Sequence, residues 1–240
     1  MSERPAPKYM SASAPVRSWR IAPDAAWTAA GLCWLAFAAV AVMVLSGNPT
    51  AFDSAGLLFW RSGPLMLPRG PVWLLEMVRD ITALGGILLR NAIALLGVGA
   101  LLALRMRREA YGLIGTVVSG WLVESALKLL VGRPRPMIVP HLTEAGGASF
   151  PSGHSFNAAL VYVALALAFA ALSARRTVRW GLIGGALALS MAIALSRVWL
   201  GVHFPSDAVA GWSAGSAWAF TAAALLARPA AVAALAADAA

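Results

Sequence analysis

Residues 155–174 read SFNAALVYVALALAFAALSA, twenty residues without a single charged side chain. A helix needs about 20 apolar residues to cross a hydrocarbon core about 30 Å thick, so this stretch predicts a membrane-spanning helix. A helix is preferred because every backbone polar group in lipid must be paired within the segment. Five further apolar stretches of similar length occupy residues 27–46, 81–104, 111–131, 180–200 and 208–227. The sequence therefore predicts an all-α, polytopic membrane helix bundle with six transmembrane helices.

The composition supports lipid as the main solvent. The chain is 60% hydrophobic and 12% charged, whereas soluble domains are roughly 45–50% apolar and about 25% charged. The net charge of +9 comes from Arg residues in short clusters between apolar stretches. This distribution fits membrane topology better than a nucleic-acid surface, so no nucleic-acid partner is expected. Cys33 is the single cysteine and allows no disulfide within the chain.

The chain divides into three parts. Residues 1–26 are predicted to be a polar cytoplasmic tail, residues 27–228 the six-span domain, and residues 229–240 a low-complexity, Ala-rich tail. A cleaved signal peptide is not expected, because the polar lead is long and no small-residue cleavage site clearly follows the first apolar run.

Arg residues set the predicted orientation. Residues 105–108 and residues 175–179 each carry three Arg residues, and the N-terminal tail is also basic. With six spans these segments share one side, which the positive-inside rule assigns to the cytoplasm together with both termini. The opposite connections, 53–80, 132–150 and 201–205, are then expected to face the periplasm. We therefore expect a multi-pass protein of the cell inner membrane whose active site faces the periplasm.

Two local patterns concern packing. Between the first two spans, one helical face carries apolar side chains and the polar ones lie off it, which predicts a short helix. This helix either lies in the membrane interface or packs on the bundle as a cap. Its apolar residues are Trp73, Leu74, Met77, Val78 and Ile81. Two pairs with small-xxx-small spacing predict close helix contacts, namely Gly181 with Gly185 and Gly211 with Gly215.

Three polar clusters fall on the predicted outer side, at residues 128–136, 151–154 and 196–207. Lys128, Arg135 and Arg197 are cations at span ends, and three converging cations suit a multiply charged anion such as phosphate. Residues 152–154 open a helix, whose free N–H groups and dipole attract anions. Each feature alone has a simpler explanation as a snorkelling anchor, a turn or a structural histidine. Their occurrence together on one side favours a phosphate site.

His203 and Asp207 lie four residues apart. On one helical turn they would share a face, so Asp207 could accept a bond from one ring nitrogen and leave the other nitrogen free to attack. Pro205 suits the first turn of a helix, which would place His203 just before it and make the geometry less certain.

The three clusters resemble the signature of the type 2 phosphatidic acid phosphatase family, whose relatives include bacterial acid phosphatases and vanadium haloperoxidases. The elements are Lys-x6-Arg-Pro at residues 128–136, Pro-Ser-Gly-His at 151–154 and Ser-Arg-x5-His-x3-Asp at 196–207. Every position of the signature is matched. The resemblance covers about residues 81–227.

The resemblance implies a role for each matched position. His203 would be the nucleophile that forms a phosphohistidine, Asp207 would orient it, and His154 would protonate the leaving oxygen. The phosphoryl oxygens would be held by the remaining matched residues, Lys128, Arg135, Ser152, Gly153 and Arg197. No metal or cofactor would be required, and cations in the site would repel a metal ion.

Four further residues are interpreted from their positions. Glu124 is expected to pair with Lys128 one turn away, and Arg90 to face the bundle or snorkel. His141 is expected to be a surface histidine with a minor role in substrate contact. Arg133 is expected either to add to the anion site or to be solvated.

The expected activity is hydrolysis of a lipid phosphate or diphosphate, such as undecaprenyl diphosphate, phosphatidylglycerophosphate or phosphatidic acid. Three alternatives stay open: a phosphotransferase that uses the same phosphohistidine, a vanadate-dependent haloperoxidase, and a non-catalytic lipid transporter. The partners are then a lipid phosphate substrate and the bilayer. The sequence leaves the oligomeric state unknown.

Overall fold

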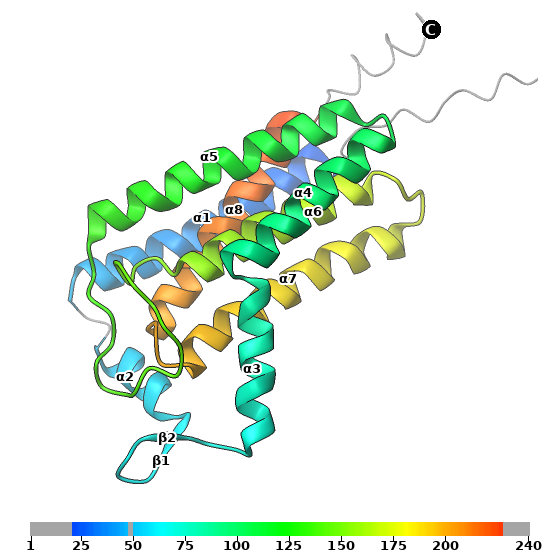
Figure 1. Ribbon diagram of the computed structural model, residues 1–240. Helices are drawn as coiled ribbons and strands as arrows, with labels where there is room; N and C mark the ends of the chain where they lie inside the picture. The colour runs from blue at the N-terminus through cyan, green and yellow to red at the C-terminus, as the bar shows by residue number, and fades with distance from the viewer. Residues whose placement is uncertain (1–20, 48–49, 228–240) are drawn as a thin grey trace, which may run out of the picture.

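The computed structural model describes residues 21–47 and 50–227, which fold into a helical bundle with one small hairpin (Figure 1). The elements in chain order are α1 (Pro23–Leu45), α2 (Thr50–Leu58), β1 (Arg61–Ser62), β2 (Leu67–Pro68), α3 (Val72–Leu84), α4 (Ile87–Ala103), α5 (Arg107–Val131), α6 (Gly153–Ala170), α7 (Arg176–Trp199) and α8 (Pro205–Leu226). The strands β1 and β2 pair antiparallel. The all-helical prediction is therefore confirmed.

Five helices in the described residues are long and apolar enough to cross a membrane: α1, α5, α6, α7 and α8. The sixth candidate is the pair α3–α4, which bends by 48°. The second span predicted at 81–104 corresponds to the second half of this bent pair, with its first residues in α3. Gly86 takes an extended conformation as the N-cap of α4, and this breaks the helix between Leu84 and Ile87.

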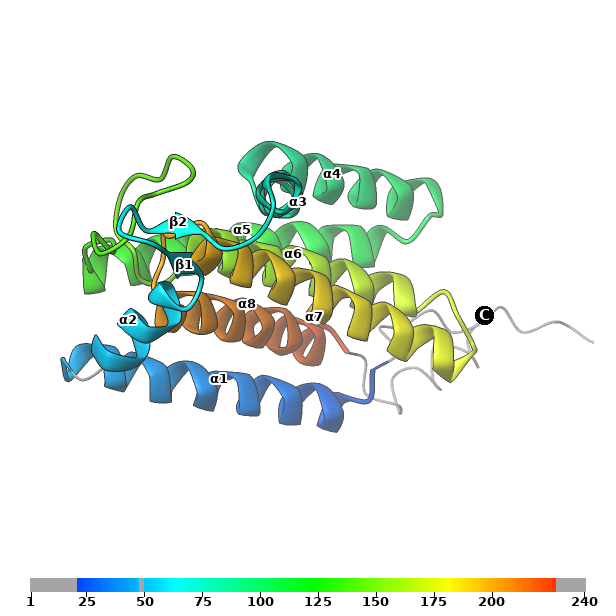
Figure 2. The same cartoon turned by 90° about the horizontal axis from the view of Figure 1, so that it is seen from below.

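Helix α6 forms the centre of the bundle. Along its apolar, membrane-spanning stretch, 78% of the residues are buried, compared with 61% for α8 and 6% for α1. Figure 2 shows α1 and α4 on opposite flanks of the bundle, with α6, α7 and α8 between them. A helix that is apolar all round suits this position, because it contacts other helices in every direction. Its first turn, at Gly153, is consequently fixed by packing on several sides.

Glycines allow α8 to approach α6 closely. A Cβ at Gly211 would meet the backbone oxygen of Ser152, and one at Gly215 would meet the backbone oxygen of Phe156. The prediction for this pair is confirmed. Gly181 and Gly185 have open space where a Cβ would be, so the corresponding prediction for α7 is wrong within the described residues.

The connection after α1 forms a cap over one end of the bundle. It contains two helices and the hairpin, whereas one short helix was predicted. Helix α3 packs through Leu74, Leu75 and Val78 against the cluster around Trp199 and the chain that follows it. Trp73 and Met77, which were predicted to belong to the apolar face, are 65% and 43% exposed. Helix α3 therefore packs on the bundle through one face and keeps other apolar side chains exposed (Figure 1).

The ends of the predicted domain shift slightly. Helix α1 begins at Pro23, which occupies the first turn with Asp24, so the polar tail predicted for residues 1–26 ends four residues early. Proline and an acidic residue both suit a helix N-terminus. The rest of that tail and residues 229–240 lie outside the described residues.

The two ends of the bundle differ in charge and loop length. The short connections at 104–106 and 171–175 join α4 to α5 and α6 to α7 at one end. The long loop 132–152 and the turn 200–204 lie at the other end, beside α2 and the hairpin (Figure 1). The predicted division of basic clusters and motif residues between opposite ends is present in the fold.

Candidate active site

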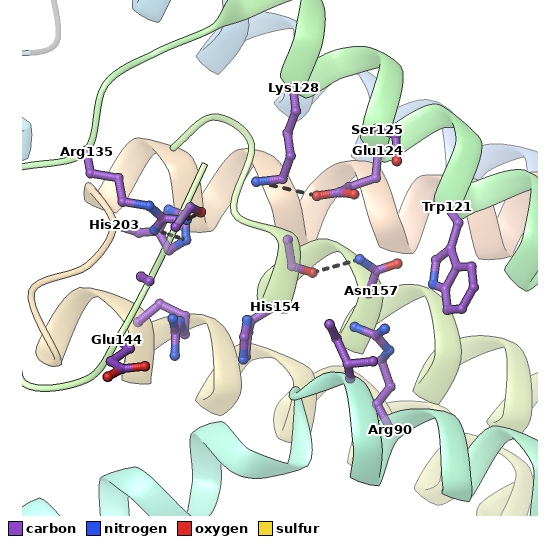
Figure 3. A pocket seen from close by; sticks show the side chains of 15 residues that line it. Arg90, Trp121, Glu124, Ser125, Lys128, Arg135, Glu144, His154, Asn157 and His203 are labelled. Carbon is purple, nitrogen blue, oxygen red and sulfur yellow. Dashed lines mark hydrogen bonds and ion pairs between the residues drawn. The ribbon is translucent and has the colours of Figure 1, made fainter. Parts of the chain in front are cut away.

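The three motif clusters converge on one cavity, at the end of the bundle where α5 and α7 end and α6 and α8 begin (Figure 3). The cavity has a volume of about 510 Å³. Six of the predicted site residues line it: Lys128, Arg135, Gly153, His154, Arg197 and His203. The other two, Ser152 and Asp207, are completely buried and do not line it.

His203 presents one ring nitrogen to this cavity. The residue is only 2% exposed, and its Nε2 atom lies 3.0 Å from Nη1 of Arg135. A guanidinium cannot accept a hydrogen bond, so Nε2 must carry a lone pair and the proton must sit on Nδ1. Nδ1 lies 3.3 Å from Oγ of Ser149. This tautomer places the unprotonated ring nitrogen beside the cationic lining.

Ser149 lies between His203 and Asp207 in the hydrogen-bond chain. Its Oγ donates to Oδ2 of Asp207 at 2.5 Å, while Oδ2 and Nδ1 of His203 are 3.6 Å apart. The expected direct bond from the histidine to Asp207 is therefore replaced by one through a serine. The reason is local: α8 begins at Pro205, Phe204 is extended, and the Phe204 amide donates to the same Oδ2 at 3.0 Å.

Burial sets the charge of His203. Desolvation lowers its pKa from 6.5 to about 4, and the charges of Arg135 and Arg197 act in the same direction. Asp207 opposes the change but does not outweigh it. The imidazole is consequently neutral at pH 7, as a nucleophile must be.

Two of the cations, Arg135 and Arg197, donate to neutral groups, which leaves their charge available to a ligand. Arg135 donates to the carbonyl oxygens of Gly146, Gly147 and Val202, and burial lowers its pKa. Arg197 is 3% exposed, and its Nη1 donates to Oγ1 of Thr82 at 2.9 Å. Its Nε is buried and has no partner in the described part of the chain.

Lys128 is the third cation of the cavity. Its Nζ atom donates to the carbonyl oxygen of Ala148 at 2.9 Å and lies 3.5 Å from Oε1 of Glu124. The predicted pairing of Glu124 with Lys128 is therefore confirmed.

The first turn of α6 contributes His154, whose ring makes no hydrogen bond to the described residues and is free to meet a leaving group. Ser152 is the N-cap, and its Oγ accepts from the amide and hydroxyl of Ser155. Its expected contact with phosphate stays a prediction. A Cβ at Gly153 would lie 2.8 Å from Oε1 of Glu124, so α5 brings this carboxylate close to the first turn of α6.

Arg133 has a role that the sequence did not indicate. It was expected to bind the anion or to be solvated, but its guanidinium contacts two carboxylates at 2.6 Å each, Asp53 and Asp207. Asp53, from α2, also accepts from the amide and hydroxyl of Ser206. Nothing in the sequence linked Asp53 to the motifs, because the two are about 80 residues apart. Ser149 carried no spacing signal either.

The remaining candidates are also placed by the structure. Arg90 is 4% exposed and lines the cavity, so it faces the bundle and does not snorkel. His141 is exposed, with Nε2 2.7 Å from the carbonyl oxygen of Pro136, and it does not line the cavity. The expected minor contact of His141 with substrate is therefore not supported.

The donor set of the cavity favours an anion. Within residues 21–47 and 50–227, no group of three or more His, Cys, Asp or Glu side chains is placed to hold a metal ion. The convergent groups are Lys and Arg side chains, and Mg²⁺ would need carboxylates and water in their place. The site can hold a phosphoryl group between a neutral histidine and a second histidine.

Comparisons with known proteins agree with this arrangement. The family model of the PAP2 superfamily matches residues 109–229, a range that includes all three motif clusters. Phosphatidylglycerophosphatase B from Bacillus subtilis (strain 168) is 38% identical over 159 residues, which cover 62% of this chain and 73% of that protein. Lipid A 1-phosphatase from Rhizobium etli is 33% identical over 112 residues, which cover 43% of this chain and 44% of that protein.

A solved structure has the same architecture. The crystal structure of a transmembrane PAP2-type phosphatidylglycerolphosphate phosphatase from Bacillus subtilis superimposes with a TM-score of 0.65 at 25% identity. The match covers 83% of this chain and 93% of the other chain. The similarity therefore extends beyond the motif region to most of the bundle.

Proposed function

This chain belongs to the PAP2 superfamily and is a multi-pass membrane lipid phosphatase, and from that membership and its site we propose that it hydrolyses phosphatidylglycerophosphate through a phosphohistidine on His203. One observation carries the proposal. Nε2 of His203 opens into a cavity beside Arg135 at 3.0 Å, and the same cavity contains Arg197 and the free ring of His154.

Two half-reactions follow from this placement. The lone pair of Nε2 attacks phosphorus, an N–P bond forms, and the bond to the leaving oxygen breaks as His154 gives that oxygen a proton. Water then attacks phosphorus while His154 takes one of its protons. The N–P bond breaks, inorganic phosphate leaves and His203 regains its lone pair. The chain through Ser149 to Asp207 stabilises the positive charge that develops on the imidazole in the first step.

The cations supply most of the stabilisation. Phosphoryl transfer depends on positioning and on charge distributed over the phosphoryl oxygens. Lys128, Arg135 and Arg197 surround the cavity in front of Nε2 and would bind those oxygens. The family is metal-independent, which agrees with a site built from cations and histidines.

A lipid substrate fits the apolar surroundings of the cavity. Its inner wall includes Ile87 and Trp121. A second, apolar cavity of about 220 Å³ lies between α4 and α5 and shares Trp121 with the first. An acyl chain in the second cavity would leave its headgroup in the first. The position of the two cavities on either side of Trp121 supports a substrate whose tails remain in the bilayer.

The proposed orientation places the site at the periplasmic face. The Arg clusters at 105–108 and 175–179 lie at the opposite end of the bundle, and positively charged loops stay in the cytoplasm. Attachment of a cysteine-reactive, membrane-impermeant label tests this point. With Cys33 replaced by Ala, a cysteine at the exposed residue Met137 should react in intact cells, and one at Arg107 should react only after lysis.

The main experiment is phosphate release by the purified protein in detergent micelles. Phosphatidylglycerophosphate, phosphatidic acid and undecaprenyl diphosphate are the substrates, and EDTA should leave the activity intact. His203→Ala should abolish release, with His141→Ala as the matched control on an exposed histidine. Substrate with a labelled phosphate should leave an acid-labile label on wild-type protein and none on His203→Ala. Full activity of His203→Ala would overturn the proposal, and a labelled acceptor other than water would indicate a transferase.

A further inference from the structure

Two polar side chains line the cavity on the other side of His154 from His203, and the proposed hydrolysis does not use them. Arg90, in the first turn of α4, is 4% exposed, and Asn157, one turn after His154 on α6, is 6% exposed. Both line the same cavity as His203. Figure 3 shows His154 between this pair and His203.

Arg90 is a buried cation on which the carboxylate of Glu124 acts only through space, without a direct contact. Its Nε and Nη2 atoms donate to Oδ1 of Asn91, its Nη1 donates to the carbonyl oxygen of Gly85, and its guanidinium lies 6.0 Å from the ring centre of Trp121. It forms no ion pair with any described carboxylate. Glu124, which also lines the cavity, pairs with Lys128 instead. A buried charge inside a membrane protein is costly unless it is paired, so this position favours an anionic ligand.

Asn157 provides an independent indication of a ligand. Its Nδ2 donates one hydrogen to the carbonyl oxygen of Gly153 at 3.0 Å, whereas its Oδ1 is buried and has no partner in the described residues. A side-chain amide has two donor hydrogens and one acceptor oxygen. The side chain therefore keeps one amide hydrogen for an acceptor oxygen of a ligand in the cavity.

Gly85 lies between the side chains of Arg90 and His154. The carbonyl oxygen of Gly85 accepts from Nη1 of Arg90 at 3.3 Å, and a Cβ built on Gly85 would lie 3.3 Å from Cδ2 of His154. His154 is the group placed to protonate the leaving oxygen. A group bonded to that oxygen on the lipid side could therefore reach Arg90 within the same cavity.

We propose that Arg90 and Asn157 form a second subsite, which binds an anionic phosphate carried by the leaving group. This inference rests on the proposed function and adds a substrate class to it. A lipid diphosphate, or a lipid whose terminal phosphate is joined through glycerol to a phosphodiester, leaves with a phosphate of its own. Phosphatidic acid leaves as uncharged diacylglycerol. The subsite selects lipids with two phosphates over lipids with one.

Farnesyl monophosphate and farnesyl diphosphate test the subsite, because they differ only in the second phosphate. We expect Arg90→Gln to lower kcat/KM for the diphosphate by about ten- to a hundredfold, as expected for a lost charge-assisted hydrogen bond. The value for the monophosphate should change little, and Arg90→Lys should retain part of the diphosphate activity. Asn157→Asp, which keeps the side-chain shape but adds a negative charge, should also lower only the diphosphate activity.

Arg107→Gln is the control, since Arg107 is exposed at the start of α5, away from the cavity. Equal losses on the two substrates in both Arg90→Gln and Asn157→Asp would overturn the subsite and leave the proposed hydrolysis intact. Failure of the wild-type protein to hydrolyse either substrate, or any lipid phosphate, would overturn both proposals.

Discussion

Arg133 forms an ion pair with Asp207 in which Nη1 and Oδ1 are 2.6 Å apart. Asp207 therefore has a fixed cation on one oxygen, while its other oxygen accepts from Ser149 and from the Phe204 amide. The carboxylate of Asp207 is thus held by a residue at a variable position of the first signature element, between Lys128 and Arg135. This relationship, and the contacts around it, lead to four predictions.

The first prediction concerns the link from Arg133 to α2. Asp53 is 1% exposed and shares the guanidinium of Arg133 with Asp207. Asp53→Asn leaves Arg133 with one carboxylate fewer, and breaking a buried pair typically costs about 3–5 kcal/mol. We expect a clear fall in the thermal unfolding temperature in detergent. Asp24→Asn, at the exposed start of α1, serves as the control, and equal unfolding temperatures for the two variants would contradict the prediction.

The second prediction concerns Ser149. Ser149→Ala removes the hydroxyl between His203 and Asp207, and it leaves a buried carboxylate oxygen and a buried ring N–H without this partner. Loss of one such bond is worth about 1–3 kcal/mol, so kcat should fall by about tenfold or more while KM changes little. Initial rates of phosphate release give both constants. Ser62→Ala, on the exposed hairpin, is the control, and unchanged kcat in Ser149→Ala would show that Asp207 acts without the serine.

The third prediction is a pH dependence. Burial lowers the pKa of His203 to about 4, and only the neutral imidazole attacks. The activity attributable to His203 is therefore present above pH 4 and is lost as the pH falls through that value, well below the ordinary histidine pKa of 6.5. Arg135 contributes to the lowering, so Arg135→Gln should raise the pKa of His203 and move the acid limb of its residual kcat/KM to higher pH.

A phosphate monoester substrate also titrates near pH 6. Comparing the wild-type protein with Arg135→Gln on the same substrate removes this effect, because the substrate's ionisation is common to both measurements. An acid limb that stays at the same pH in Arg135→Gln would argue against the assignment to His203.

The fourth prediction separates two glycines of the same spacing pattern. A Cβ at Gly215 would collide with the backbone oxygen of Phe156, which cannot move without displacing α6. Gly215→Ala should therefore unfold the protein or lower its unfolding temperature strongly. Gly181→Ala meets nothing within 4 Å and should be neutral or more stable by up to about 1 kcal/mol, because alanine favours helices. Thermal unfolding of the two purified variants measures the difference, and equal effects would contradict the packing described for α8.

Much of the fold could be predicted from the sequence because hydrophobic length reports directly on membrane spans. The positions of α1, α5, α6, α7 and α8 follow from that signal, and the motif residues gather because successive spans alternate direction. The bend between α3 and α4 escaped prediction, since an average over apolar residues is insensitive to the conformation of Gly86.

Contacts within the site were harder to predict than its location. The spacing of His203 and Asp207 suggested a direct bond, but that rule applies only where both residues are helical, and Phe204 is extended. Ser149 and Asp53 reach Asp207 through loops and a separate helix, and no sequence period connects them. Arg133 could be recognised as a cation near the motifs, but its partner was visible only in three dimensions.

The burial of α6 has a consequence for how such a protein can change over time. His154 sits on the first turn of a helix enclosed by its neighbours, and His203 follows a helix packed against it. The two imidazoles proposed to react thus lie beside the most buried helix of the bundle. Helix α4 lies at the periphery (Figure 2), and its residues Ile87 and Arg90 line the cavity. Mutation can therefore remodel which headgroups are admitted while the bond-breaking apparatus stays the same, and related proteins could diversify their lipids without reinventing their chemistry.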